Sequence, residues 1–303
     1  MPVAFSAMGP ITFVGVPVDS VGRVGGTEHA PAALRDLGLL DVLGARDAGD
    51  LDVRIRGEER DPETGVVAGP DVLATTAALR TAVAEVISDG ARPLLAGGCC
   101  SEVPGALAGA RDALGRIGLA YLDGHLDLYD GKTSPTGEAA DMPISVAFGR
   151  GPAAWVEVAG GATLSPENAA LVGYRDREES RSYGMLQPEE LGPGLTHLSV
   201  DEVRDEGSAV IGERVAGALS ERGPMWLHLD VDVLDQGVFP ATDYLMPNGM
   251  TWEELMPVLA PIAASASLAG VSLGCYNPDK DPVRECGRAL VGAIGRVLDG
   301  GGS

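Results

Sequence analysis

Short apolar runs alternate with longer segments of helical periodicity along most of this 303-residue chain. Short apolar runs bounded by turn residues predict buried strands, and the longer segments between them predict helices that cover a sheet. The expected strands cover residues 11–16, 53–55, 93–96, 117–122, 169–174, 197–200, 226–231 and 268–273. The expected helices cover residues 31–43, 71–88, 104–114, 139–148, 207–222, 252–264 and 282–298.

This order of elements shows no internal repeat and no linker, and therefore predicts an α/β fold. About eight strands that alternate with helices form a mainly parallel sheet between two helical layers. We expect residues 1–299 to form a single domain. We expect residues 300–303, whose sequence is Gly-Gly-Gly-Ser, to form a flexible tail. In such a fold the catalytic residues lie at the carboxyl ends of the strands.

The composition narrows the function classes. The net charge of −22 and the isoelectric point of about 4.4 argue against binding to nucleic acid or to anionic membranes, which requires a basic face. The apolar runs are too short to span a bilayer, and no signal sequence is evident. The four cysteines do not form a disulfide framework. We therefore expect a cytoplasmic protein with reduced thiols.

Two acidic motifs follow apolar strands and suggest a metal site. Asp123, His125 and Asp127 have a spacing of two, and Asp230 and Asp232 repeat that spacing. Alternate residues of an extended chain face one side, so each set is expected to face one site. Carboxylates packed this closely repel one another unless a cation lies between them. Carboxylate-rich ligation with an imidazole suits Mn²⁺. The alternative is that the aspartates cap turns and loops and that His125 is a hydrogen-bonded core histidine.

Three further residues have two interpretations each. Cys99 and Cys100 follow the strand at residues 93–96, either as small buried apolar residues or as thiols that bind a metal or act as nucleophiles. His228 lies two residues before Asp230, on the face that Asp230 shares with Asp232. It is either a hydrogen-bond donor behind the metal ligands or a core histidine.

Together these residues resemble the arginase (ureohydrolase) superfamily, which includes agmatinase, guanidinobutyrase and formimidoylglutamase. The resemblance covers most of the chain. The matching motifs, in order, are residues 15–20, 27–31, 97–101, 123–127, 137–143, 230–235 and 277–278. The resemblance implies a three-layer α/β/α arginase-like fold, a pair of Mn²⁺ ions, and a homo-oligomer, either a trimer or a hexamer.

The resemblance also implies roles for the acidic residues. In the family, a metal-activated hydroxide attacks a guanidinium or amidine carbon, because two cations lower the pKa of water. By position, Asp123 and Asp230 would contact both metals, and His125 and Asp232 would complete one of them. Asp127 would complete the other metal and hydrogen-bond the hydroxide. Asp123, Asp127 and Asp230 are therefore the expected catalytic residues, and Cys100 is the expected sixth metal ligand.

Two departures from the family pattern bear on the substrate. Cys100 stands where the family has a histidine ligand, and a thiolate is softer and suits Mn²⁺ less well. Cys275 stands where the family has a glutamate that pairs with the substrate guanidinium. The chain is similar in this to a cysteine-containing subgroup that includes hydrolases of Nω-hydroxy-L-arginine. An N-hydroxyguanidine is less basic, so the loss of the anionic partner costs less.

We therefore expect a Mn²⁺-dependent hydrolase, with one or two ions, that cleaves a C–N bond in a guanidine, N-hydroxyguanidine or amidine. The residues expected to contact this small-molecule substrate are Glu138, Asp141, Glu178, Asp243 and Cys275. One alternative is a diverged member with weak or absent metal, which binds a ligand or partner or performs a different biosynthetic reaction. Another is thiol catalysis, but the sequence shows no histidine near the cysteines to activate a thiol.

Overall fold

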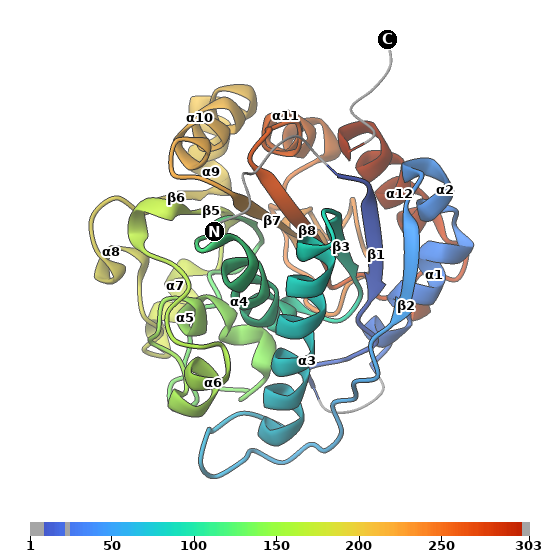
Figure 1. Cartoon of the computed structure of the whole chain (residues 1–303). Helices are drawn as coiled ribbons and strands as arrows, with labels where there is room; N and C mark the ends of the chain where they lie inside the picture. Colours follow the sequence, from blue (N-terminus) through green and yellow to red (C-terminus); the bar gives the residue numbers. More distant parts are fainter. Residues whose placement is uncertain (1–8, 22–24, 299–303) are drawn as a thin grey trace.

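The computed structural model describes residues 9–21 and 25–298, and it contains one eight-stranded sheet in the order β2-β1-β3-β8-β7-β4-β5-β6 (Figure 1). Every neighbouring pair of strands is parallel, which confirms the expected α/β class. The strands are β1 Ile11–Gly15, β2 Arg46–Asp50, β3 Arg92–Ala96, β4 Gly118–Leu122, β5 Ala169–Tyr174, β6 Thr196–Ser199, β7 Met225–Asp230 and β8 Leu268–Gly274. The assignment of residues 1–299 to one domain stays a prediction, and the expected tail at 300–303 lies outside the described residues.

Helices cover both faces of the sheet, as the three-layer expectation requires (Figure 1). One layer contains α3 Gly69–Ser88, α4 Val103–Leu114, α5 Pro143–Ala147 and α6 Ala153–Val158. The other contains α1 Ala30–Asp36, α2 Leu39–Leu43, α9 Val200–Glu206, α10 Ser208–Ser220, α11 Trp252–Ala263 and α12 Glu285–Leu298. The short helices α7 Arg177–Ser182 and α8 Pro188–Leu191 lie between β5 and β6 in the chain.

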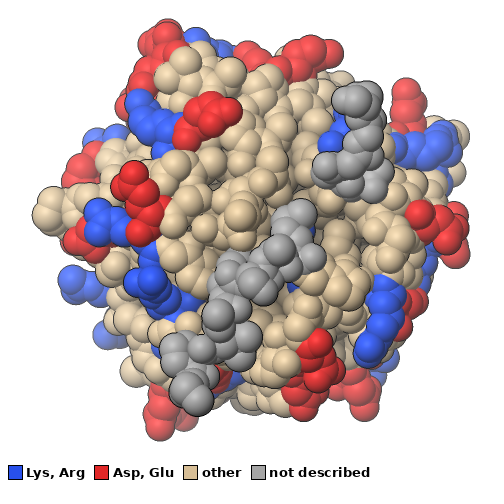
Figure 2. All heavy atoms as spheres, turned by 45° about the horizontal axis from the view of Figure 1, so that its top comes forward, with Lys and Arg blue, Asp and Glu red and all other residues tan. Residues whose placement is uncertain are grey.

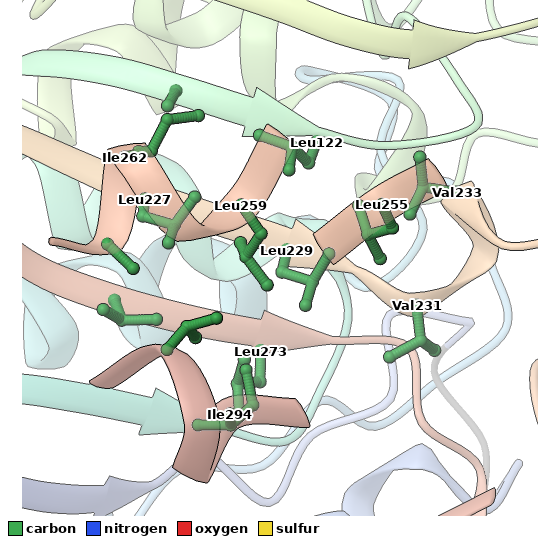
Figure 3. Packing of buried hydrophobic residues seen from close by; sticks show 14 of the residues in the cluster. Leu122, Leu227, Leu229, Val231, Val233, Leu255, Leu259, Ile262, Leu273 and Ile294 are labelled. Atoms are coloured by element: carbon green, nitrogen blue, oxygen red, sulfur yellow. The ribbon is translucent and has the colours of Figure 1, made fainter. Parts of the chain in front are cut away.

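Side chains alternate between two apolar cores, one on each face of the sheet. Leu122 of β4 and Leu229 of β7 pack with Leu255 and Leu259 of α11 on one side (Figure 3). Trp226 of β7 belongs to the core on the other side, beneath α3 and α4. Because successive strand residues face opposite sides, the next positions on the Trp226 side of β7 are residues 228 and 230. The sheet thus directs both of these polar side chains toward one edge of the second core.

The expected elements differ from the structure at the first crossover. The predicted strand at 53–55 is wrong, because the edge strand is β2 at Arg46–Asp50, whose residues are polar and mostly exposed. A solvent-facing edge strand lacks the apolar pattern that identifies a buried strand. The predicted helix at 31–43 is two helices, separated at Gly38, whose φ of 82° interrupts the helical path.

Other differences concern short elements. The predicted helix at 139–148 is a 3-10 turn at Ala139–Asp141 followed by α5. Helices α6 to α9 were not expected, because segments of four to seven residues show too few turns to reveal a period. Within the described residues no helix has the length and apolar character needed to cross a membrane. Figure 2 shows one face of the molecule, on which acidic and basic side chains intermingle around the outline.

Candidate metal centre and substrate cavity

The unusual polar residues meet at the carboxyl ends of four adjacent central strands. The strands lie in the order β3-β8-β7-β4. Cys100 begins a 3-10 turn shortly after β3, Asp123 follows β4, Asp230 ends β7 and Cys275 follows β8. Parallel strands bring their carboxyl ends to one edge of the sheet, so segments more than 100 residues apart in the chain converge there, as Cys100 and Asp230 do at a separation of 130 residues.

The acidic motifs reach the site through the turns that follow strands β4 and β7, and of their residues Asp230 alone still lies in a strand. Strand β4 ends at Leu122, so the expected strand alternation of Asp123, His125 and Asp127 is wrong. Instead, the amide of His125 donates to Asp123 Oδ1 at 2.7 Å, and the amide of Asp232 donates to Asp230 Oδ1 at 2.8 Å. Each aspartate thus accepts the amide two residues later, which is an Asx-type turn. The second carboxylate oxygen of each remains available to the site.

The first group of potential ligands surrounds the Cys100 thiol. Cys100, Asp123, His228 and Asp230 are all buried, and their donor atoms lie within 4.8 Å of one another. Cys100 Sγ lies 2.8 Å from Asp230 Oδ2 and 3.3 Å from Asp123 Oδ2. His228 Nε2 lies 3.4 Å from the same sulfur. The thiol is therefore the point where the two carboxylates and the imidazole meet.

The second group consists of Asp123, His125 and Asp232. His125 Nδ1 lies 3.1 Å from Asp232 Oδ2 and 3.5 Å from Asp123 Oδ1. The amide of Gly124 donates to Asp232 Oδ1 at 3.1 Å and fixes that carboxylate. Asp123 belongs to both groups, so the two groups are adjacent and share one carboxylate.

Asp127 lies in the wall of the same cavity but in neither group. Its φ of 51° places it in the left-handed region, which non-glycine residues seldom adopt. The hydroxyl of buried Tyr121 donates a hydrogen bond to Asp127 Oδ2. This bond and the unusual backbone conformation orient the carboxylate, and its expected place among the metal ligands stays a prediction.

Burial and the closeness of the carboxylates shift the pKa values of the ionisable side chains in the site. Burial, reinforced by neighbouring carboxylates, raises the pKa of Asp123, and it raises the pKa of Asp127 and Asp230 well above the usual range. For His125, burial opposes the charged form, but the carboxylates of Asp232 and Asp123 outweigh it and raise the pKa well above its usual value. Burial also disfavours ionised Asp232, but His125 outweighs it and lowers the pKa of that carboxyl.

The two groups fit a pair of divalent cations. Arg175 lies beside the carboxylates, but its Nη2 donates to backbone oxygens, at 2.7 Å to Asp232 O and 3.3 Å to Leu234 O. Its guanidinium donates to backbone oxygens and not to these carboxylates, and its charge, after that of His125, helps to lower the pKa of Asp232. Buried carboxylates require a cation or a proton, and oxygen, nitrogen and sulfur donors in adjacent groups match divalent metals.

The surroundings of Cys100, Cys275 and His228 favour the neutral form of each side chain. Burial, together with Asp230 and Asp123, raises the pKa of Cys100 well above that of a free thiol. The contact with Cys100, whose Sγ lies 4.0 Å away, raises the pKa of Cys275. Burial lowers the pKa of His228 to about 3. All four cysteines are free, so the adjacent pair Cys99–Cys100 is not a disulfide.

A cavity of about 300 Å³ opens above the two groups. Its wall is acidic, and carboxylates that converge on a partly enclosed space attract cations. The acidic residues that line it outside the two groups are Asp19, Asp127, Glu138, Asp141, Asp176, Glu179 and Asp243. The cavity therefore suits a small cationic molecule whose reactive end lies over the metal groups.

Four of the expected substrate-binding residues line this cavity, namely Glu138, Asp141, Asp243 and Cys275. Glu138 accepts a hydrogen bond from the Tyr244 hydroxyl, and Asp141 accepts one from Ser134 Oγ at 2.7 Å. Asp243 pairs with Lys280, whose Nζ lies 2.6 Å from Oδ1, so its charge is partly compensated.

Glu178 does not line the cavity. It is exposed on α7, whereas Glu179 and Asp176 beside it do line the cavity. Burial raises the pKa of Asp176 to about 6. Asp176 and Tyr121 were both missed from the sequence. Tyr121 had a detectable signal, because it lies two residues before Asp123, but an isolated acidic residue such as Asp176 carries none.

Comparison with known proteins supplies independent information. The sequence model of the arginase family matches residues 10–297. A curated arginase from Bacillus caldovelox is 28% identical over 299 residues, which cover 96% of this chain and 98% of that protein. A curated Nω-hydroxy-L-arginine amidinohydrolase from Streptomyces lavendulae is 34% identical over 224 residues, or 72% of each chain. The solved structure of the arginase from Bacillus caldovelox matches with a TM-score of 0.84 at 25% identity, over 96% of this chain and 98% of that one.

Proposed function

Because the chain belongs to the arginase family, whose members are metal-dependent amidinohydrolases, we propose that it hydrolyses a C–N bond in a guanidine, N-hydroxyguanidine or amidine. The proposed cofactor is Mn²⁺, at least at the Asp123–His125–Asp232 group, whose donors are oxygen and nitrogen. The observation that carries the proposal is the shared carboxylate of Asp123, which joins two ligand groups beneath an acidic cavity.

The side chains around the cavity have distinct proposed roles. When bound, the metal ions act as Lewis acids and make hydroxide available near neutral pH. Glu138 and Asp141 hold the cationic substrate by charge and orient its reactive end toward Asp123. Asp127, oriented by the hydroxyl of Tyr121, takes up in its ionised form the proton released by the attacking water and passes it to the departing nitrogen.

Among these substrate types, we propose that an N-hydroxyguanidine is preferred. Cys275 lines the cavity beside Cys100 and carries no obligate negative charge to pair with a strongly basic guanidinium. The N-hydroxyl group lowers the basicity of the guanidine, so a neutral neighbour is less costly. The similarity to the amidinohydrolase from Streptomyces lavendulae, which acts on Nω-hydroxy-L-arginine by its name, supports this preference.

The test is a comparison of substrates with a matched pair of variants. Metal-loaded protein is incubated with L-arginine, agmatine and Nω-hydroxy-L-arginine, and the released urea or hydroxyurea is quantified. We expect release from at least the N-hydroxylated substrate, and loss of release in Asp127→Asn. Asp205→Asn, on exposed α9, makes the same chemical change away from the cavity and should leave turnover intact. No release from any of the three substrates would contradict the proposal.

Thiol catalysis has one observation in its favour, because the structure supplies the neighbouring histidine that the sequence did not reveal. His228 Nε2 lies 3.4 Å from Cys100 Sγ. However, burial lowers the pKa of His228 to about 3 and raises that of Cys100, so the pair is neutral and not a thiolate with an imidazolium. The metal-based reaction remains the better supported function.

The alternative to a hydrolase is a diverged member of the family that binds metal weakly or not at all and does not hydrolyse these substrates. Elemental analysis after equilibration with Mn²⁺ distinguishes the two, since an empty site would favour the diverged protein. Assembly as a homo-oligomer and residence in the cytoplasm complete the proposal, and light scattering of the purified protein tests the assembly.

A further inference from the structure

His228 is held by packing and a hydrogen bond in a way that the proposed function does not explain. His228 is fully buried, and in register it lies between Tyr121 of β4 and Ser272 of β8. Tyr121 stacks on the imidazole with ring centroids 4.9 Å apart and an interplanar angle of 14°. On the other side Ser272 Oγ lies 2.7 Å from His228 Nδ1. The ring is thus held on both sides, and its Nε2 points at Cys100.

We propose that His228 is a metal ligand through Nε2, and that Cys100, Asp123, His228 and Asp230 form a centre that prefers Zn²⁺ over Mn²⁺. The proposal rests on the proposed function only in assuming that the cluster holds metal. Asp127 lies in neither group, so the first group needs another fourth donor beside Cys100, Asp123 and Asp230. The proposal assigns that role to His228 of strand β7.

The distances are compatible with four donors around one ion. A zinc ion about 2.3 Å from sulfur and about 2.1 Å from an imidazole nitrogen, with tetrahedral angles, separates these two atoms by roughly 3.6 Å. The distance between Cys100 Sγ and His228 Nε2 is 3.4 Å. Cys100 Sγ lies 3.3 Å from Asp123 Oδ2 and 2.8 Å from Asp230 Oδ2, so only the last contact must lengthen appreciably.

The hydrogen bonds around the imidazole allow Nε2 to act as a ligand. Ser272 Oγ accepts a hydrogen bond from Trp226 Nε1 at 2.9 Å. A hydroxyl oxygen has two lone pairs, so Ser272 can also accept from His228 Nδ1–H. In that arrangement Nε2 carries a lone pair toward Cys100. An outer hydrogen bond from the second ring nitrogen is the usual support for a metal-bound histidine.

Strand β8 leaves the space that the imidazole needs. Gly274 faces Asp230 in register, and a Cβ at this glycine would lie 3.1 Å from His228 Cε1 and 3.4 Å from Nε2. A side chain there would crowd the ring away from the thiol. The glycine therefore keeps Nε2 at the distance that the centre requires.

The donor chemistry distinguishes this centre from its neighbour. Thiolate and imidazole donors favour Zn²⁺, while the oxygen and nitrogen donors of Asp123, His125 and Asp232 suit Mn²⁺. Because Asp123 belongs to both groups, we infer a mixed-metal pair in which the softer ion lies beside Cys100.

A spectroscopic test reads the ligand directly and does not depend on activity. The chain has four histidines, so protein labelled with ¹⁵N-histidine gives few imidazole signals. It is stripped of metal and given one equivalent of ¹¹³Cd²⁺, a thiol-seeking stand-in for Zn²⁺. We expect scalar coupling between ¹¹³Cd and one His228 nitrogen, with His29 and His197 unchanged. Cadmium bound by sulfur without coupling to His228 would overturn the proposal, and so would failure of the protein to bind cadmium.

A competition for metal supplies the second readout. Equilibration with equal Zn²⁺ and Mn²⁺ should leave at least one Zn²⁺ per chain, because zinc generally binds such donors more tightly than manganese. His228→Gln should lower zinc affinity more than 100-fold, beyond the roughly 10–100-fold of an outer-sphere change. His197→Gln, which alters a half-buried histidine outside both groups, is the matched control. If the protein turns over a guanidine without coupling to His228, only this inference fails. If coupling appears without turnover, only the proposed function fails.

Discussion

Removal of the Tyr121 hydroxyl tests how Asp127 is oriented. Tyr121 and Asp127 are both buried, at 0% and 7% exposure, and the phenol donates to Asp127 Oδ2. Tyr121→Phe keeps the ring that stacks on His228 and deletes only this donor. A hydrogen bond to a charged group contributes about 2 kcal/mol, and its loss leaves a buried carboxylate without that partner. We expect a loss of about 2 kcal/mol in the free energy of unfolding.

The same substitution should change catalysis and its pH dependence. The bond from Tyr121 favours the ionised carboxylate and opposes the rise in the pKa of Asp127 that burial causes. Its removal raises that pKa further, so the acid limb of the kcat profile should move to higher pH. We also expect kcat to fall roughly tenfold, because a misoriented Asp127 raises the activation free energy by about 1.4 kcal/mol.

The assay compares Tyr121→Phe with Tyr174→Phe under saturating metal. Tyr174 is also buried, and its hydroxyl contacts His197 Nδ1 at 3.1 Å, away from the cavity. The control removes a buried hydroxyl outside the cavity and should cost about 1 kcal/mol, or roughly 3 °C in Tm, without affecting kcat. If the two variants lose the same stability and Tyr121→Phe keeps the parent kcat and pH profile, the role assigned to this bond is wrong.

Three further predictions follow from the electrostatics of the site. Removal of metal by a chelator should lower Tm more at about pH 8 than at about pH 5. At the lower pH protons compete with the metal for Asp230 and Cys100, because burial raises the pKa of both groups. Calorimetry at both pH values checks this, and equal shifts in Tm would contradict it. Asp176→Asn should raise the free energy of unfolding by up to about 3 kcal/mol at about pH 8 and leave it unchanged at about pH 4, as measured by urea denaturation. A buried carboxyl whose folded-state pKa is raised to about 6 costs the protein stability as pH rises through that value, and the substitution removes this cost. Cys275→Glu should lower KM for an unhydroxylated guanidine by about tenfold relative to Cys275→Ser, if the missing negative charge sets the substrate preference.

The parallel sheet and the acidic motifs were predictable because their signals are local. Asp123 and Asp230 each follow an apolar strand, and strands of this type place their ends at one edge of the sheet. The edge strand β2 was not predictable, because a polar strand that faces solvent lacks a hydrophobic period. The short helices α6 to α9 were missed for lack of length.

The contact of Cys100 with His228 lay beyond sequence reasoning for a different reason. The two residues are 128 positions apart. Their contact depends on the strand order β3-β8-β7-β4 and on the register that pairs His228 with Tyr121 and Ser272. A sequence reveals which residues share a strand face, but the neighbour across the sheet is a property of the assembled topology. For this reason the histidine near the cysteines appeared to be absent.

The recurrence of a spacing of two in both acidic motifs has a physical cause that strand alternation does not supply. In each motif the first aspartate accepts the amide of the residue two positions later through Oδ1, at 2.7 Å for Asp123 and 2.8 Å for Asp230. One oxygen is thereby fixed by the backbone, while Oδ2 of both residues faces Cys100 Sγ. The turn thus holds two buried carboxylates close together without a metal, at the cost of the raised pKa values that burial and mutual repulsion produce. In the proposed site a divalent cation would relieve that cost, so the backbone determines where the ligands lie, and the cation would stabilise their ionised form.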